Sequence, residues 1–216
     1  EELASLTPFF LSVHKRLQEF QPNTRGVLHV SPFIPREQVD RLLQEPPHPK
    51  VGGLQGTLEG DRLTGDGVEL LVSREENLFH LSRSELALSI PGTKTAEAGY
   101  LRTPVVTLLP LNRPEELPSI GLVGLLDYLP GGKKLKGRLL LRLKGKLGLL
   151  AHPNILAGRQ LLPELVEVME EKWLSQQVGP ILLEKKKLQE VSDTLRSLYS
   201  WQPQPARALV EVMLNS

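Results

Sequence analysis

The chain has 216 residues, 40% of them hydrophobic and 24% charged, with a formal net charge of +1. This composition suits one large or two small globular domains and excludes wholesale disorder. The low net charge and the 5% aromatic content argue against a nucleic-acid partner. The absence of cysteine excludes disulfides and thiolate metal sites. The sequence contains no signal-peptide pattern and no membrane-spanning apolar run, and its start at Glu1 indicates a cut or processed end.

The N-terminal region predicts a helix, a strand and a second helix. Residues 3–21 place apolar side chains three and four positions apart, which is typical of a helix with one buried face. The short apolar run 26–31 indicates a strand. Pro35 then opens a helix over 36–44, because proline is tolerated in the first helical turn.

Strands and helices alternate in the next part of the chain. Glycines and the turn Gly65-Asp66-Gly67 predict a hairpin or two short strands within 51–73. Beyond them the pattern predicts short helices over 75–83 and 95–101 and buried strands over 86–90 and 105–109. This alternation favours an α/β fold with a mostly parallel sheet.

The character of the sequence changes beyond Leu111. Prolines and glycines over 112–132 predict a long loop or a broken helical segment. The rest of the chain is mostly helical, with helices expected over 164–173, 181–199 and 206–214.

The segment 132–150 is leucine-rich and basic, and no acidic residue occurs from Tyr128 through Pro163. If this segment is helical, leucines four positions apart form one stripe and basic residues form the neighbouring stripe. Like charges at that spacing repel, and an anionic surface would relieve the repulsion. The pattern therefore favours a membrane-surface element, with a solvated basic face over a leucine core as the alternative.

The segment Ile90-Pro91-Gly92-Thr93-Lys94-Thr95-Ala96-Glu97 joins a predicted strand to a predicted helix. A turn of small residues at such a junction leaves backbone N–H groups free, and these groups attract a phosphate together with the positive end of the helix. The Thr93 and Thr95 hydroxyls add donors, and the Glu97 carboxylate can accept bonds from ribose hydroxyls. The alternative is a plain turn in which Thr93 caps the helix and Glu97 supports the cap.

A second polar segment runs from His152 to Glu164. Its loop ends in Gly158 and leads through Pro163 into the expected helix, with Asn154 and Arg159 flanking an apolar stretch. By itself this pattern indicates no more than a connection between helices.

Metal chemistry and hydrolysis have little support in the sequence. The five histidines are scattered without ligand spacing, and no nucleophile elbow is present. The carboxylates form no recognisable acid–base pair. The sequence therefore predicts no metal site and leaves the catalytic residues unknown.

Together these segments resemble the C-terminal half of lipid-A-disaccharide synthase and its close relatives. The best match is the run Pro153-Asn154-Ile155-Leu156-Ala157-Gly158-Arg159 and its continuation Pro163-Glu164-Leu165, similar to the family's proline-asparagine-leucine-leucine-alanine-glycine-arginine run with its proline-glutamate-leucine follow-on. The second match is Gly92-Thr93-Lys94-Thr95-Ala96-Glu97, similar to the family's glycine-threonine-x-threonine-x-glutamate turn. The resemblance extends over residues 3–214.

The resemblance implies the GT-B fold, in which two Rossmann-like domains enclose the active site. Residues 1–150, with the basic segment 132–150, would form the Rossmann-like nucleotide-sugar-binding domain. Residues 151–216 would supply the family loop and the C-terminal helices. The first strand of this domain and the whole N-terminal domain, which carries the acceptor site and the catalytic base, would be missing. The chain alone is therefore not expected to catalyse transfer.

The resemblance also implies roles for individual residues. Gly92, Thr93 and Thr95 would lie at the donor diphosphate and Glu97 at the ribose, and Asn154 and Arg159 would line the donor side of the cleft. The sequence departs from the family at Pro91, where a serine usually precedes the glycine. This change removes a hydroxyl and one N–H group from the turn.

The implied reaction transfers an acylated glucosamine-type sugar from a UDP-sugar to a lipid-linked acceptor, without a metal or another cofactor. The enzyme would be cytoplasmic and peripheral on the inner membrane, and exposed apolar helix faces would favour a homodimer. One alternative is a non-catalytic nucleotide-sugar or protein interaction domain of the same ancestry. Another is a different GT-B enzyme, such as a UDP-sugar epimerase or the peptidoglycan GlcNAc transferase.

Overall fold

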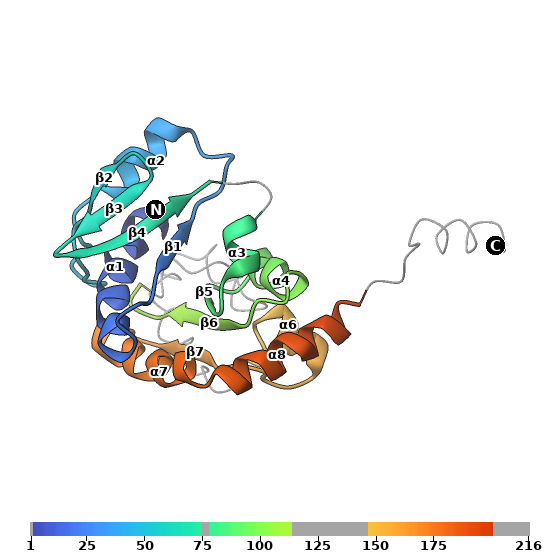
Figure 1. The fold of residues 1–216 in the computed structure, drawn as a ribbon. Helices are drawn as coiled ribbons and strands as arrows, with labels where there is room; N and C mark the ends of the chain where they lie inside the picture. Colours follow the sequence, from blue (N-terminus) through green and yellow to red (C-terminus); the bar gives the residue numbers. More distant parts are fainter. Residues whose placement is uncertain (1, 75–77, 114–146, 201–216) are drawn as a thin grey trace, which may run out of the picture.

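The computed structural model describes residues 2–74, 78–113 and 147–200, which form a mixed α/β structure with two sheets (Figure 1). The helices are α1 (Glu2–Phe20), α2 (Arg36–Leu43), α3 (Phe79–Arg83), α4 (Thr93–Tyr100), α6 (His152–Ala157), α7 (Glu171–Leu183) and α8 (Lys185–Leu198). The strands are β1 (Gly26–His29), β2 (Thr57–Glu59), β3 (Arg62–Gly65), β4 (Val68–Ser73), β5 (Ala87–Ser89), β6 (Val105–Pro110) and β7 (Glu164–Glu167).

The first sheet has the order β1-β4-β3-β2. Strand β1 runs parallel to β4, with Gly26 opposite Leu70, whereas β2, β3 and β4 form an antiparallel meander. Asp66 and Gly67 connect β3 to β4 with φ angles of 50° and 77°. Two consecutive positive φ angles match the right-handed twist of a tight hairpin. The predicted hairpin is therefore confirmed, and a third strand extends it.

The second sheet is parallel throughout, with the order β5-β6-β7. Five of the six residues of β6 are buried, as expected for a central parallel strand covered on both faces. Helix α4 connects β5 to β6 and begins just after the carboxyl end of β5. In parallel α/β sheets this edge is where ligands usually bind.

Helix α1 contributes to two separate hydrophobic clusters. Phe9 and Val13 pack with Val106 and Leu108 of β6 and with residues of α7 and α8. Leu11 instead packs with residues of β3 and β4. Figure 1 shows α1 beside both sheets, with α7 and α8 along the side of the second sheet. The larger cluster draws on residues both before and after position 150.

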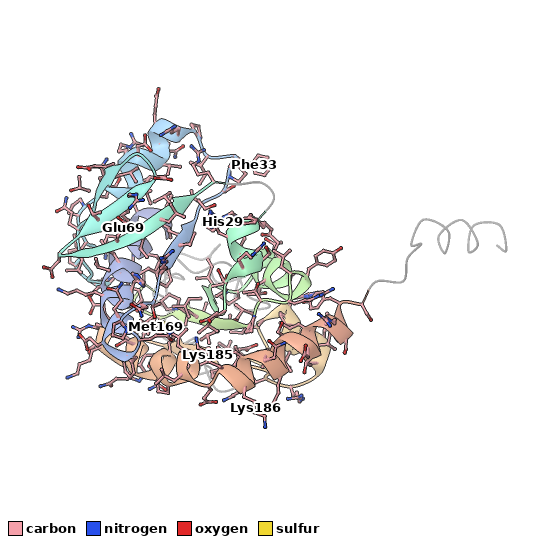
Figure 2. All side chains as sticks on the ribbon, in the orientation of Figure 1. His29, Phe33, Glu69, Met169, Lys185 and Lys186 are labelled. Atoms are coloured by element: carbon pink, nitrogen blue, oxygen red, sulfur yellow. The ribbon has the colours of Figure 1, made fainter. Side chains whose placement is uncertain are left out.

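A lysine at the start of α8 ties this helix to two distant segments. Lys185 Nζ lies 2.5 Å from the Glu85 carboxylate and 3.5 Å from Gln21 Oε1. The next residue, Lys186, points away from the molecule (Figure 2). Exposed ion pairs of this kind contribute little stability, so the buried side chains of α8, namely Leu188, Val191 and Leu195, carry most of its packing.

Most of the elements predicted from the sequence are present. The helices expected over 3–21, 36–44 and 95–101 correspond to α1, α2 and α4. The expected strands 26–31, 86–90 and 105–109 correspond to β1, β5 and β6. The expected α/β fold with a parallel sheet is present in β5-β6-β7. Among the described residues, a second sheet adds an antiparallel meander, which the sequence analysis expected only as a hairpin or two short strands.

Two predicted helices differ from the structure. The region expected as a helix over 164–173 begins with β7, which pairs with β6, and α7 starts only at Glu171. Pro163 therefore precedes a strand, and its carbonyl accepts a bond from Thr107 N at 3.2 Å. The helix expected over 181–199 is broken at Glu184, where ψ is 57°. No glycine or proline lies beside Glu184, and the spacing of apolar residues does not change there. The sequence therefore gives no sign of this break.

Several predictions lie outside the described residues. They concern most of the basic segment 132–150, the loop over 112–132 beyond Arg113, the start of the helix expected over 75–83, and the helix expected over 206–214. Within the described ranges, no helix has the length and apolar character needed to cross a membrane.

Candidate functional site

The turn before α4 has an open backbone. Gly92 has φ 140° and ψ −164°, a conformation that residues with a side chain rarely adopt. Gly92, Thr93 and Lys94 are exposed, and a Cβ atom added to Gly92 would meet no atom within 4 Å. The amides of Thr93 and Lys94 occupy the first turn of α4, where N–H groups lack helical partners. This end of the helix can therefore accept an anion from solvent.

Thr95 is buried and its hydroxyl is already engaged. Its side-chain oxygen donates to the Gly92 carbonyl at 2.8 Å and accepts a bond from the His152 amide at 3.1 Å. The residue is 0% exposed. The Thr95 hydroxyl thus joins the two segments that the sequence singled out, and it faces the protein rather than a ligand.

Glu97 lies on the half-buried side of α4. Its carboxylate pairs with Lys94 Nζ at 2.7 Å, and the side chains of Lys94 and Glu97 are 47% and 33% exposed. The pair leaves the second carboxylate oxygen available. Glu97 remains accessible enough to accept hydrogen bonds from hydroxyl groups of a ligand.

Asn154 is fully engaged within the protein. Its Nδ2 group donates to the Leu162 carbonyl at 3.2 Å and to Glu164 Oε1 at 2.8 Å, and its Oδ1 accepts a bond from Leu161 N at 2.8 Å. The residue is 2% exposed. Asn154 therefore holds the loop between α6 and β7 in its turn.

Glu164 organises the start of α6, a role that the sequence did not suggest. Its carboxylate accepts bonds from Leu150 N and Ala151 N, both at 2.8 Å, besides the bond from Asn154. Ala151 is the N-cap residue of α6. Carboxylates are favoured near helix N-termini, so Glu164 both orients this end and satisfies its donors. No local pattern in the sequence indicates this pairing, because the loop between Asn154 and Glu164 decides which side chains meet.

Gly158 ends α6 in the left-handed conformation, with φ 64°. The next amide, Arg159 N, donates to Asn154 O at 3.2 Å, which is typical of a glycine-terminated helix. The Arg159 side chain is exposed. Arg159 is one of the six residues that the resemblance assigns to the site. Its guanidinium is open to solvent, next to the loop that the hydrogen bonds of Asn154 hold in place.

A histidine and a tyrosine join α6 to the end of α8. His152 Nδ1 lies 2.6 Å from the Tyr199 hydroxyl, and the Tyr199 ring packs on Gly99 of α4. A Cβ atom at Gly99 would lie 2.5 Å from the Tyr199 oxygen, so a larger residue would displace the Tyr199 ring. Burial raises the pKa of Tyr199 above its usual value, which keeps the hydroxyl protonated. The contact places α8 against both site segments.

The structure thus brings the predicted residues together in part. Thr95 and the start of α6 are in direct contact although 57 positions separate Thr95 from His152. In the described parts of the chain, no group of three or more potential metal ligands occurs. A shallow depression at the start of α8 is lined by residues 183–187 and Glu190 and shares no residue with the turn.

Comparison with known proteins adds no family to this description. No family model matches the chain, and no curated protein matches it.

Proposed function

We propose that this chain is the donor-binding portion of a glycosyltransferase that takes a UDP-sugar at the turn before α4. The observation that carries the proposal is the contact between the two segments of the resemblance, through His152 N and Thr95 Oγ1. Free amides at Gly92–Lys94 would receive the diphosphate, and the positive end of α4 would stabilise its charge. Glu97 would accept bonds from the ribose, and Arg159 would approach the donor from α6.

The proposal includes the GT-B fold, in which one continuous sheet would carry the site. Among the described strands, β1 pairs only with β4 and β5 only with β6, and α1 packs against the cores of both sheets. One further parallel strand between β1 and β5 would join the two sheets. Hydrogen exchange of a longer chain that carries the family's preceding strand tests this arrangement. The amides of β1 and β5 that face away from β4 and β6 should become protected from exchange. Exchange of these amides as rapid as in the present chain would contradict a single sheet.

We also propose that the acceptor is a lipid-linked sugar at an anionic membrane surface, approached by the basic segment 132–150. This part of the proposal rests on the sequence alone. Flotation with vesicles of anionic and of neutral lipid measures it. Binding to the anionic vesicles that is lost at high salt is expected, because screened charges attract weakly. Absence of binding to either vesicle would exclude the idea.

A non-catalytic interaction domain of the same ancestry is the second candidate. It is favoured by the hydrogen bonds of Thr95 and Asn154, which leave neither polar group free for a ligand. Affinity for UDP separates the two candidates, because an interaction domain that has lost the nucleotide site would not bind it.

Calorimetric titration with UDP tests the donor site directly. Saturable binding is expected, and Glu97→Gln should weaken it about tenfold or more because a charged acceptor for the ribose is lost. Glu69→Gln is the matched control. Glu69 is also an exposed carboxylate paired with a cation, Arg62 at 3.0 Å, but it lies on β4 of the other sheet. Equal affinities for all three proteins would remove Glu97 from the site.

A further inference from the structure

A chain of hydrogen bonds connects β7 to the turn before α4. Glu164 holds the amides of Leu150 and Ala151, each at 2.8 Å. The next amide, His152 N, donates to Thr95 Oγ1 at 3.1 Å, and Thr95 Oγ1 donates to Gly92 O at 2.8 Å. Every link is backbone or a buried or half-buried side chain, so the position of one end constrains the other.

The last link determines where an amide points. The Gly92 carbonyl and the Thr93 N–H belong to one planar trans peptide unit, in which the two groups point in opposite directions. The Gly92 carbonyl accepts two bonds from Thr95, one from its hydroxyl and one from its amide at 3.1 Å. These bonds turn the carbonyl toward the helix and therefore direct the Thr93 N–H outward. Gly92 itself resists rotation poorly, because glycine is the most permissive residue.

We propose that Thr95 and Glu164 are positioning residues for anion binding at the Thr93 amide, with Glu164 acting through the start of α6. This inference rests on the proposed donor site and replaces the expected contact of the Thr95 hydroxyl with the diphosphate. Without the Thr95 hydroxyl, the Gly92–Thr93 peptide loses one of its two tethers. The two carboxylate oxygens of Glu164 each accept one of the amides of 150–151. A glutamine there keeps one oxygen and turns an NH2 group toward the other amide, so the start of α6 shifts and His152 N moves away from Thr95.

Two substitutions at one position isolate the hydroxyl. Thr95→Val keeps the shape of the side chain but removes the hydroxyl, whereas Thr95→Ser keeps the hydroxyl. We expect Thr95→Val and Glu164→Gln to weaken UDP binding about tenfold and Thr95→Ser to retain the parent affinity. The control is Thr7→Val on α1, where another buried threonine donates to a backbone carbonyl, Leu3 O, at 2.6 Å. It should lose stability without losing affinity.

A second readout does not depend on the nucleotide. The amide resonance of Thr93 in a nitrogen–proton correlation spectrum reports the orientation of the Gly92–Thr93 peptide. The spectra are recorded without ligand and well below the thermal midpoint of each variant. The Thr93 resonance should shift in Thr95→Val and Glu164→Gln and stay near its original position in Thr95→Ser and Thr7→Val. Equal spectra for the valine and serine variants at position 95 would overturn the positioning role. Where the parent chain binds UDP, equal UDP affinities of these two variants would overturn it as well. If the parent chain binds no UDP while the Thr93 resonance shifts as expected, the proposed function fails and the positioning of the amide stands.

Discussion

Replacing Gly53 by alanine is expected to lower the free energy of unfolding by about 3–5 kcal/mol, the sum of a strained backbone and an overpacked contact. Gly53 has φ 120°, which side-chain-bearing residues rarely adopt. A Cβ atom would also lie 2.2 Å from the Pro8 carbonyl carbon and 2.4 Å from Phe9 N. Because backbone atoms of α1 cannot rotate away, the connection over 52–54 would have to separate from the helix. Urea unfolding followed by circular dichroism measures the loss.

The matched control is Gly60→Ala in the turn between β2 and β3. Gly60 also has a positive φ, 65°, but nothing lies within 4 Å of the position of its Cβ. Only the backbone cost of about 1–2 kcal/mol is therefore expected. The difference between the two variants measures the close approach of residue 53 to α1. Equal losses would show that the approach contributes nothing.

The effect of Gly53→Ala should extend beyond the turn. Leu54 N donates to Pro8 O at 2.9 Å, so the same contact carries a hydrogen bond between the connection and α1. Moving the connection outward by the length of a bond would break it. Hydrogen exchange of the Leu54 amide should therefore accelerate in Gly53→Ala and remain slow in Gly60→Ala.

Replacing Asn154 by alanine is expected to cost about 2–4 kcal/mol of unfolding free energy, because buried partners lose their hydrogen bonds. The change leaves Leu161 N without its acceptor, Leu162 O without its donor, and Glu164 with one donor fewer. Thermal and urea unfolding measure the loss. A cost below about 0.5 kcal/mol, as for an ordinary surface residue, would show that water replaces these bonds.

Asn154→Asp tests the pairing with Glu164 more sharply. It keeps an acceptor for Leu161 N but places a carboxylate oxygen where Nδ2 now lies, 2.8 Å from Glu164 Oε1. Two ionised carboxylates at this distance repel each other strongly, so the pKa of the pair is raised in the folded state. The folded protein then binds more protons than the unfolded chain, and stability falls as pH rises through that range. The variant should be least stable near neutral pH and approach the parent as the pH is lowered, and a deficit independent of pH would refute the contact.

These results would also bear on the proposed site. Asn154 was assigned to the donor side of the cleft, whereas its three hydrogen bonds are internal. A variant such as Asn154→Ala would then lose nucleotide affinity only as far as the loop before Arg159 changes shape. Arg159, which is exposed, is the residue of this segment that can reach a ligand directly.

The sequence alone determined the elements that local signals encode. Apolar spacing predicted α1 and α2, and the glycines around Asp66 predicted the β3–β4 hairpin, because these patterns depend on neighbours a few residues away. The small-residue turn before α4 was likewise predicted, from its place between an expected strand and an expected helix. The structure adds that Gly92 takes backbone angles which residues with a side chain rarely adopt.

The tertiary structure decided what depends on partners distant in sequence. Residues 164–167 have a pattern compatible with either a helix or a strand, and pairing with β6 selected the strand. Thr95 and Asn154 have side chains suited to a ligand, but their donors and acceptors were taken by His152, Leu161 and Glu164. A polar side chain bonds whichever partner the fold places beside it, and the sequence does not specify that partner until the chain has packed.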